Sequence, residues 1–462
     1  MNIYQHVEIV IRELDSKLLL ATLAASRGHQ VIVSDVESIE KGLKKKVLAP
    51  GIFHTKSLTP TDAKIARHQT IIDNGSIVSS IDEEGGLVEK GYDREAKFRF
   101  SDQTVEQAST IFGWGPEDVE TLKKIYPKHS SKIYKTGSPR ADLWKSRFSD
   151  YWGVPKGAPA KPFLLVVSHM SHANYALPFH SIIASSRKGG QFKRDPKWFA
   201  KKFGMAVEHY RATAAFIEAI QHLSKLDTGY DIVLRPHPTE NIESWKIYLE
   251  GIPNVHVIRQ GSITGWVNKA FAVMHNGCTT GLEATVSGKP LVTYMPFKQE
   301  YGNEVSTELG YSVKNLEELS STINKLYISG QSINQNSSNK SFTDEVSKKI
   351  YIDNDELASE KIIKIWESLP NASDKLSQST NWIKFQFLLK TMKFNGIVGK
   401  VLRNLFPSKF SKLGPEKDNF KFPPLDRQDI NERINRLQNV LGIDKKIECK
   451  LLSERTILIK QS

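Results

Sequence analysis

An arginine and a histidine follow an apolar run in the segment YDIVLRPHP, residues 230–238. The run predicts a buried strand, so both side chains would lie just past its carboxyl end, where open α/β sheets bind ligands. Arg235 can offer two parallel N–H groups to a phosphate or carboxylate, and His237 can donate to a departing phosphate or act as a general acid. Pro238 helps to fix the backbone beside the histidine. The alternative is a solvated loop histidine.

The segment MHNGCTTGLEATVS predicts a strand that ends in a turn of small residues and opens a helix. Backbone N–H groups of residues 277–281 would point out of the helix N-terminus and form an anion site for phosphate or carboxylate. The alternative is an ordinary helix start, with Thr279 or Thr280 as N-cap and Glu283 in a capping box. The candidate donor-binding residues are Asn276, Gly277, Thr279, Thr280 and Glu283, the last placed to accept from sugar hydroxyls.

Serines and histidines alternate in VSHMSHAN, residues 167–174, again directly after an apolar run. Ser168, His169 and Ser171 are candidates for holding a phosphate or a sugar, and a plain polar turn is the alternative. His169 and His172 have a spacing that suits a metal. The neighbouring sequence has no carboxylate or cysteine cluster to complete such a site, so no metal is expected.

Three consecutive carboxylates precede two glycines in IDEEGG. Mutual repulsion would raise one pKa, which makes Glu83 and Glu84 candidate acid/base groups and Asp82 a candidate for binding acceptor hydroxyls. A solvated turn is the alternative. Arg140, in the strand-to-helix turn GSPRAD, is a candidate anion-binding residue on the acceptor side. Asp195, in DPKW, suits a helix N-cap that is followed by proline.

These candidates need regular elements to position them. Residues 2–9 and 29–35 predict strands on either side of a helix at 14–27, a βαβ opening typical of a doubly wound sheet. A Pro- and Gly-rich stretch at 152–162 predicts a linker. The fold class is therefore α/β, with two facing Rossmann-like domains at 1–153 and 154–369. Further strands are expected at 47–52, 70–73, 76–81, 110–114, 132–136, 163–167, 231–234, 255–258, 272–274 and 291–293, and helices at 195–226 and 281–286.

The composition of the 462 residues limits the function classes. Charged residues make up 25% and aromatic residues 9%, which is typical of a folded protein. Two cysteines exclude a disulfide scaffold and fit a reducing compartment. No signal peptide is expected, and no apolar stretch approaches the roughly 20 residues of a membrane span. The net charge of +13 points to a nucleic acid, an anionic membrane or an anionic substrate.

The chain changes character after residue 369. Residues 375–415 contain eight lysines and arginines and no acidic residue, interleaved with aromatic and aliphatic side chains. This pattern is typical of an amphipathic segment on an anionic membrane surface, and the alternative is a tail packed on the body with its lysines solvated. Residues 370–462 are expected to form a basic amphipathic C-terminal extension, with a helix from Asp426 and a strand at its end.

Five motifs in order, MNIYQHVEIVIRELDSKLLLATLAASRGHQV, IDEEGG, TGSPRADLW, RPHP and HNGCTTGLEA, resemble the bacterial surface carbohydrate biosynthesis proteins. The resemblance covers about residues 1–365 and includes the retaining β-Kdo glycosyltransferases of lipopolysaccharide O-antigen and related glycans. It implies a GT-B fold of two Rossmann-like domains, with the donor CMP-Kdo in the second. It also implies that His237 and Pro238 contact the CMP phosphate, and that Thr279 and Thr280 hold nucleotide and donor carboxylate.

Retaining β-Kdo enzymes use an aspartate nucleophile and a covalent glycosyl-enzyme intermediate. The resemblance makes Asp195 the preferred candidate, because it precedes the His-Pro pair in the donor domain. The expected function is transfer of Kdo, or a related ulosonic acid, from CMP-Kdo to a surface glycan acceptor, without a cofactor. The protein is expected to be cytoplasmic and peripheral at the inner face of the cytoplasmic membrane.

Two alternatives belong to other classes. One is a CDP-glycerol or ribitol-type polyol-phosphate transferase of surface polymer synthesis, which also uses His-Pro and Ser/Thr-rich phosphate motifs. The other is a non-catalytic polyanion-binding protein, indicated only by the net charge; the sequence has no nucleic-acid motif, so no nucleic acid is expected. The sequence also lacks a P-loop, a GxSxG elbow and an HExxH helix.

Overall fold

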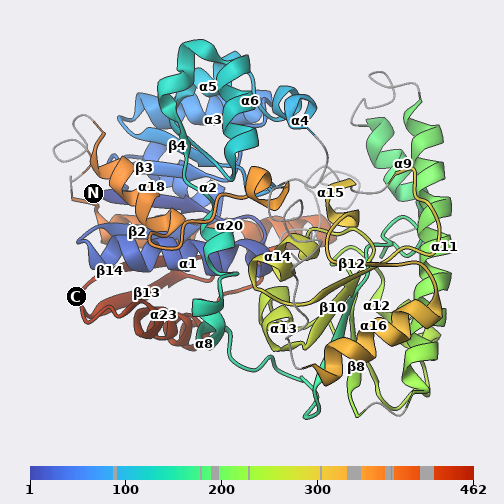
Figure 1. Cartoon of the computed structure of the whole chain (residues 1–462). Coiled ribbons are helices and arrows are strands. Elements are labelled where there is room, and N and C mark those ends of the chain that lie inside the picture. Colours follow the sequence, from blue (N-terminus) through green and yellow to red (C-terminus); the bar gives the residue numbers. More distant parts are fainter. Residues whose placement is uncertain are drawn as a thin grey trace. The chain divides into compact units, whose positions relative to one another are not determined.

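The computed structural model (Figure 1) describes residues 1–86, 91–176, 179–188, 197–226, 229–301, 304–329, 345–369, 376, 379–405 and 421–462. The chain divides into two compact units. Unit 1 includes Met1–Gly86, Gly91–Leu143 and Ser347–Ser462, and unit 2 includes Trp144–Val346. Each unit is built on a mainly parallel sheet with helices, so the predicted α/β class is confirmed.

Unit 1 contains a sheet of eight strands in the order β13-β14-β2-β1-β3-β4-β5-β6. β1 to β6 run parallel, while β14 pairs antiparallel with β2 and with β13. The strands are β1 (Asn2–His6), β2 (Gln30–Ser34), β3 (Ile52–Thr55), β4 (Ile77–Ile81), β5 (Ala108–Gly113), β6 (Ile133–Lys135), β13 (Ile447–Ser453) and β14 (Thr456–Gln461).

Helices connect and flank these strands. Asp35 caps α2 by accepting the N–H of Ser38, and Thr61 caps α3 by accepting that of Lys64. The helices of unit 1 are α1 (Val10–Ser26), α2 (Val36–Lys44), α3 (Asp62–Asp73), α4 (Asp93–Arg99), α5 (Asp102–Gln107), α6 (Pro116–Ile125), η1 (Pro127–Lys132), α7 (Pro139–Asp142), α18 (Ala358–Glu367), α20 (Trp382–Leu405) and α23 (Arg427–Leu441).

Unit 2 contains a parallel sheet of six strands in the order β12-β11-β10-β7-β8-β9. β7 reads FLLVV and is buried along its whole length, as expected for a strand covered on both faces. The strands are β7 (Phe163–Val167), β8 (Asp231–Arg235), β9 (Val255–Val257), β10 (Ala272–His275), β11 (Leu291–Tyr294) and β12 (Tyr311–Val313). The helices are η2 (Ser146–Phe148), α8 (Ser149–Trp152), α9 (Phe179–Lys188), α11 (Trp198–Ser224), α12 (Ile242–Tyr248), α13 (Ile263–Lys269), α14 (Thr280–Val286), α15 (Glu304–Thr307) and α16 (Leu316–Ile328).

The units do not follow the predicted division into 1–153, 154–369 and 370–462, because the chain returns to unit 1 after unit 2. The carboxylate of Asp142 accepts the N–H groups of Ala358 and Ser359 at 3.1 and 3.0 Å and so holds the start of α18. The indole of Trp366 donates to Ser79 Oγ at 2.9 Å in the core of unit 1. The described residues after 370 also belong to unit 1, not to a separate extension.

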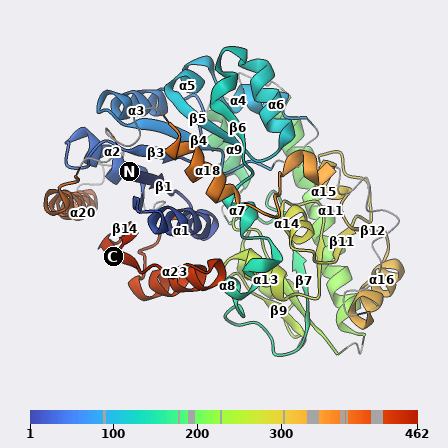
Figure 2. The ribbon, with the colours of Figure 1, turned by 60° about the vertical axis from the view of Figure 1, so that its left-hand side comes forward.

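The C-terminal elements pack on the N-terminal ones within unit 1. In Figure 2, α23 lies along α1 and α20 lies beside α2, and contacts join both pairs. One predicted strand is wrong: residues 70–73 form the last turn of α3, because the helix that Thr61 caps continues through them. No helix in the described part of the chain combines the length and the apolar character needed to cross a membrane.

Candidate functional site

In unit 2, a buried carboxylate joins the turn after β7 to the loop after β8. The side chain of Glu240 accepts hydrogen bonds from Ser168 Oγ, the Met170 N–H and the Trp245 indole, each at 2.7 Å. Burial raises the pKa of Glu240. Sequence reasoning missed this residue, although it stands two positions after the RPHP motif. Glu240 therefore positions the predicted residue Ser168, whose hydroxyl is committed to this contact.

Three contacts hold Nδ1 of His237. The backbone N–H of Thr239 can only donate, and it points at His237 Nδ1 over 3.3 Å, so for the neutral ring we assign Nδ1 as the acceptor and the proton to Nε2. The Thr239 hydroxyl lies 2.8 Å from the same Nδ1, and the Ser171 hydroxyl lies 3.3 Å from it. The ring thus presents an N–H donor at Nε2, while the next residue, Pro238, is exposed.

Four imidazole rings pack together around this point. The ring centroids of His169 and His237 are 5.4 Å apart, those of His169 and His209 are 5.9 Å apart, and those of His172 and His209 are 4.9 Å apart. We call these four residues the histidine cluster. Lys202 joins it, with Nζ 3.3 Å from His172 Nε2. His209 and Lys202 come from α11 and were not predicted.

Burial favours the neutral form of three rings of the cluster, those of His169, His172 and His209. It lowers the pKa of His169, lowers that of His172 to about 4 and lowers that of His209 to about 3. Burial also lowers the pKa of Lys202. The positive charge of Lys202 further lowers the pKa of His172. These three rings are therefore bases that would gain a proton only if an opposite charge came close to them.

Arg235 has a backbone-holding role in this structure. Its guanidinium donates to the carbonyl oxygens of Gln260 at 2.6 Å, Gly261 at 2.8 Å and Arg259 at 3.1 Å, and it lies over the ring of Trp266. Burial lowers the pKa of Arg235 to about 10. These contacts fix the loop after β9, and the predicted contact of Arg235 with a phosphate stays a prediction.

The turn before α14 differs from the predicted anion site. The N–H groups of Gly277 and Cys278 donate to Nδ1 of the buried His275 at 3.3 and 3.2 Å, and the N–H of Gly281 donates to the Cys278 carbonyl at 3.0 Å. The expectation that N–H groups throughout 277–281 point outward is wrong, because a buried imidazole and the turn itself take three of them. The other ring nitrogen of His275 lies 2.8 Å from Thr293 Oγ1, and burial lowers the His275 pKa to about 3.

The remaining predicted side chains of this turn differ in exposure. Thr279 is the N-cap of α14 without a side-chain capping bond and is exposed, whereas Thr280 and Glu283 are buried. Asn276 is also buried, and among the described residues its Oδ1 has no hydrogen-bond partner. A ligand that donates to Asn276 would satisfy this oxygen. Asp195 lies outside the described residues, so its role as nucleophile stays a prediction.

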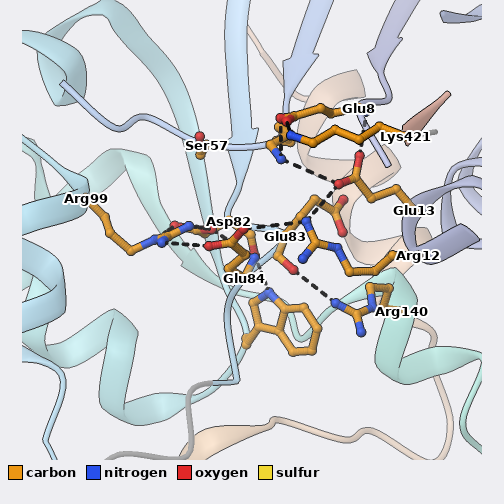
Figure 3. A network of polar contacts seen from close by, with 12 residues as sticks. Glu8, Arg12, Glu13, Ser57, Asp82, Glu83, Glu84, Arg99, Arg140 and Lys421 are labelled. Atoms are coloured by element: carbon orange, nitrogen blue, oxygen red, sulfur yellow. Dashed lines mark hydrogen bonds and ion pairs between the residues drawn. The ribbon is translucent and has the colours of Figure 1, made fainter. Parts of the chain in front are cut away.

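In unit 1, charged side chains form a dense network past the ends of β1, β3 and β4 (Figure 3). The carboxylate of Asp82 accepts hydrogen bonds from Nε and Nη2 of Arg99, the second at 2.6 Å. Nη1 of the same arginine donates to the carboxylate of Glu84 at 3.0 Å. Glu84 is also 3.6 Å from Arg12. The structure thus brings the predicted carboxylates together, with arginines between them that offset their repulsion. Burial acts to raise the pKa of Glu84, but Arg99 and Arg12 outweigh it and the pKa is lowered, so the expectation of a raised pKa is wrong for Glu84.

Glu83 points into the unit instead. Its carboxylate lies 2.6 Å from Nζ of Lys17, and both side chains are almost fully buried. Arg140 donates to the backbone carbonyl of Glu83 at 3.0 Å and lies over the ring of Trp114. Since Asp82 and Glu83 are buried, Glu84 is the carboxylate of the three that solvent or a ligand reaches.

A second part of the network surrounds the start of α1. Glu13 is buried and accepts the N–H of Glu8 at 2.8 Å and a guanidinium N–H of Arg12 at 3.0 Å. Lys56 and Lys421 each lie 2.7 Å from Glu8. Figure 3 shows Lys421 reaching Glu8 from a distant part of the sequence. These contacts join the segments that follow β1 and β3 to the C-terminal segment at Lys421.

No group of three or more His, Cys, Asp or Glu side chains in the described ranges is arranged to hold a metal ion. This statement covers the histidine cluster, in which the ring pairs His169–His237 and His172–His209 lie edge to face. The groups near the cluster that could contact a phosphate are the N–H assigned to His237 Nε2 and the side chain of Lys202.

Comparison with known proteins gives similar folds and no family. No protein-family model matches the chain, and no curated protein matches it. Among solved structures, the UDP-GlcNAc 2-epimerase of Methanocaldococcus jannaschii is 13% identical with a TM-score of 0.46, over 79% of this chain and 99% of that one. A glycosyltransferase of Rickettsia africae is 11% identical with a TM-score of 0.41, over 82% and 99%. The wall teichoic acid polymerase TagF is 12% identical with a TM-score of 0.42, over 71% and 73%. At such values the similarities carry no information about the chemistry of either unit.

Proposed function

We propose that the chain is a glycosyltransferase that moves Kdo, or a related ulosonic acid, from a CMP-activated donor in unit 2 to a surface glycan acceptor. The observation that carries the proposal is His237, held with an N–H donor at Nε2 beside neutral bases at the ends of β7 and β8. The resemblance of the RPHP and HNGCTTGLEA motifs to the β-Kdo enzymes supports the choice of donor.

A donor phosphate against the histidine cluster would accept a hydrogen bond from His237 Nε2 and be attracted by Lys202. Its negative charge would raise the lowered pKa values of His172 and His209, so that the bound anion and a proton favour each other. The negative charge that develops on the departing CMP would be stabilised by hydrogen-bond donors that are already positioned. Such preorganised electrostatic stabilisation usually makes the largest single contribution to lowering the activation free energy. Phosphate binding and proton uptake are therefore coupled in this proposal.

Other predicted residues take different parts. Glu240 positions the turn after β7, which carries His169 and His172, whereas Arg235 holds the loop after β9. Asn276 Oδ1 would accept a hydrogen bond from an N–H or O–H group of the donor substrate. Asp195 is proposed as the nucleophile. On the acceptor side Glu84 is the exposed carboxylate and is proposed as the base, whereas Glu83 is proposed to have a structural role because of its buried ion pair.

The second candidate function is a polyol-phosphate transferase with a CDP-glycerol or CDP-ribitol donor. The same observation favours it, because a cluster of several bases suits the two phosphates of a CDP donor. The two candidates differ in which donor loses its nucleotide. Purified protein is incubated with CMP-Kdo or CDP-glycerol and a panel of glycan acceptors, and release of CMP is measured. Release from CMP-Kdo alone supports the first; absence of release from CMP-Kdo with every acceptor would refute it.

His237 gives the sharpest variant test. In His237→Gln the amide N–H reaches close to the position of Nε2, whereas in His237→Asn it does not. Loss of one hydrogen bond to a charged group costs about 1.5–3 kcal/mol, so His237→Asn is expected to bind CMP roughly 10- to 100-fold more weakly, and His237→Gln to retain most affinity. Equal affinity for CMP in the two variants would contradict the assigned tautomer.

Proton uptake tests the coupling separately. Calorimetry of CMP binding at pH 7, in two buffers with different ionisation enthalpies, is expected to show uptake of protons. Cytidine, which lacks the phosphate, is the matched control and is expected to show none. His172→Gln should reduce the uptake seen with CMP. Asp195→Asn is expected to abolish transfer and leave CMP binding unchanged; full transfer would exclude Asp195 as nucleophile.

A further inference from the structure

Helix α20 has two apolar faces, one of which packs against unit 1. Phe385, Leu388 and Leu389 are buried. Phe385 lies directly over Gly42 of α2, where even a methyl group would come within 2.9 Å of the ring. The N–H of Asn381 donates to the Val47 carbonyl at 3.2 Å just before the helix begins. This inner face fixes the orientation of the helix.

The outer face carries large apolar side chains in solvent. Ile383 is 82% exposed, Phe387 72%, Phe394 64%, Ile397 53% and Val398 38%. With about 100° between successive helical residues, these five fall within an arc of about 100°, opposite to the buried face. Isolated exposed apolar residues are ordinary, but an aligned stripe of five on one helix marks a surface that another phase or molecule covers.

Lysines border this stripe. On the same helical projection Lys384 and Lys393 flank it on either side, and Lys390 lies within its edge. All three are exposed, and Lys393 pairs with Glu454. The sequence from 375 to 415 contains no acidic residue. The surface is therefore apolar with positive charge at Lys384 on one margin and at Lys390 within the stripe, while Glu454 offsets the charge of Lys393 on the other margin.

We propose that this outer face of α20 lies on an anionic lipid bilayer, with the five apolar side chains at the boundary between headgroups and acyl chains. Charge complementarity selects this occupant: lipid phosphates would neutralise the lysines while the apolar stripe leaves water. A second copy of the chain placed on the same face would bring lysines against lysines. The proposal concerns where the protein resides and is independent of the donor chemistry in unit 2.

The test uses the full-length protein and vesicles in a flotation assay. Vesicles of phosphatidylglycerol and phosphatidylethanolamine are compared with vesicles of phosphatidylcholine alone. The parent is expected to float with the anionic vesicles and not with the neutral ones. The triple variant Ile383→Ser/Phe387→Ser/Phe394→Ser is expected to bind the anionic vesicles at least about tenfold more weakly, since each side chain loses much of its apolar transfer energy.

Matched controls come from other exposed apolar side chains. Phe98→Ser in unit 1 and Ile328→Ser in unit 2 remove comparably exposed residues, 55% and 82%, outside α20 and should float like the parent. Lys384→Ala/Lys390→Ala should weaken binding to the anionic vesicles by roughly tenfold or more, and added salt should weaken binding of the parent. Circular dichroism checks that each variant is folded. Unchanged flotation of the folded triple variant would overturn the proposal. It would also be overturned if the parent protein formed a dimer in the absence of lipid and the triple variant did not.

Discussion

The buried ion pair between Lys17 and Glu83 gives a prediction that separates a structural from a catalytic carboxylate. Nζ and Oε1 are 2.6 Å apart, and the side chains are only 2% and 4% exposed. With an effective dielectric constant of about 20, two unit charges at this distance attract by about 6 kcal/mol. Removal of each ion from water costs several kcal/mol, so the intact pair contributes little net stability.

Removal of one partner has a different result. Lys17→Met leaves a buried carboxylate without its ammonium and is expected to destabilise unit 1 by about 3–5 kcal/mol. Glu83→Leu leaves the ammonium in the same position without its carboxylate and is expected to cost a similar amount. The double variant Lys17→Met/Glu83→Leu removes both charges and is expected to recover to within about 1–2 kcal/mol of the parent, with an interaction energy of at least about 2 kcal/mol.

The free energy of unfolding is measured by urea titration, and native-state hydrogen exchange of the α1 amides reports on unit 1 by itself. Lys41 and Glu37 provide the matched control, because their ion pair has the same 2.6 Å separation with side chains 45% and 65% exposed. Lys41→Met should cost less than about 1 kcal/mol. Single variants that each cost less than about 1 kcal/mol and add up in the double variant would refute the reasoning. Parental CMP release by the folded double variant would remove Glu83 from the catalytic residues.

Two further predictions concern packing and pH. A Cβ at Gly281 would lie 2.5 Å from His275 Cε1, so Gly281→Ala should destabilise unit 2 by about 1–3 kcal/mol in thermal unfolding. A Cβ at Gly396 would have nothing within 4 Å, so Gly396→Ala should stabilise the protein slightly. Equal effects of the two substitutions would contradict the assigned packing. Burial lowers the pKa of His68 to about 4. When the pH is lowered from 7 to 5, this histidine therefore takes up a proton in the unfolded chain but not in the native state, and the free energy of unfolding decreases. Urea titrations at both values should show that His68→Leu loses about 1–2 kcal/mol less than the parent over this interval; parallel losses would show that His68 is not buried as a neutral ring.

The sequence was most informative where local pattern and tertiary environment agree. The run FLLVV predicts β7 at its observed bounds, because a fully buried strand needs continuous apolar side chains. Residues 70–73 were predicted as a strand from their β-branched side chains, but the cap at Thr61 starts a helix that includes them. The strand predicted at 47–52 begins at Ile52, since the preceding residues form the turn after α2.

In the candidate site, too, the contacts that follow from strand topology could be predicted, and those made by side chains from distant segments could not. His169 and His237 follow adjacent parallel strands, so their proximity could be expected from topology. His209 comes from α11, 37 residues from the His172 amide that it contacts, and no local pattern distinguishes it from other helical histidines. His275 follows the strand predicted at 272–274 and was given no role, yet its ring accepts two of the N–H groups on which the predicted anion site depended, those of Gly277 and Cys278. Such effects depend on side-chain direction in three dimensions, which spacing alone does not encode.

The return of the chain to unit 1 has a consequence for protein synthesis. The strand β14 supplies the antiparallel neighbour of β2, and Ser34 and Thr456, joined by their hydroxyls in that pairing, are 422 positions apart. At typical elongation rates β14 leaves the ribosome about 20 to 80 s after β2. Throughout that interval the edge of β2 lacks its final partner while all of unit 2 emerges, and an uncovered strand edge invites pairing with other chains. A nascent chain of this protein should therefore expose the edge of β2 until β14 emerges.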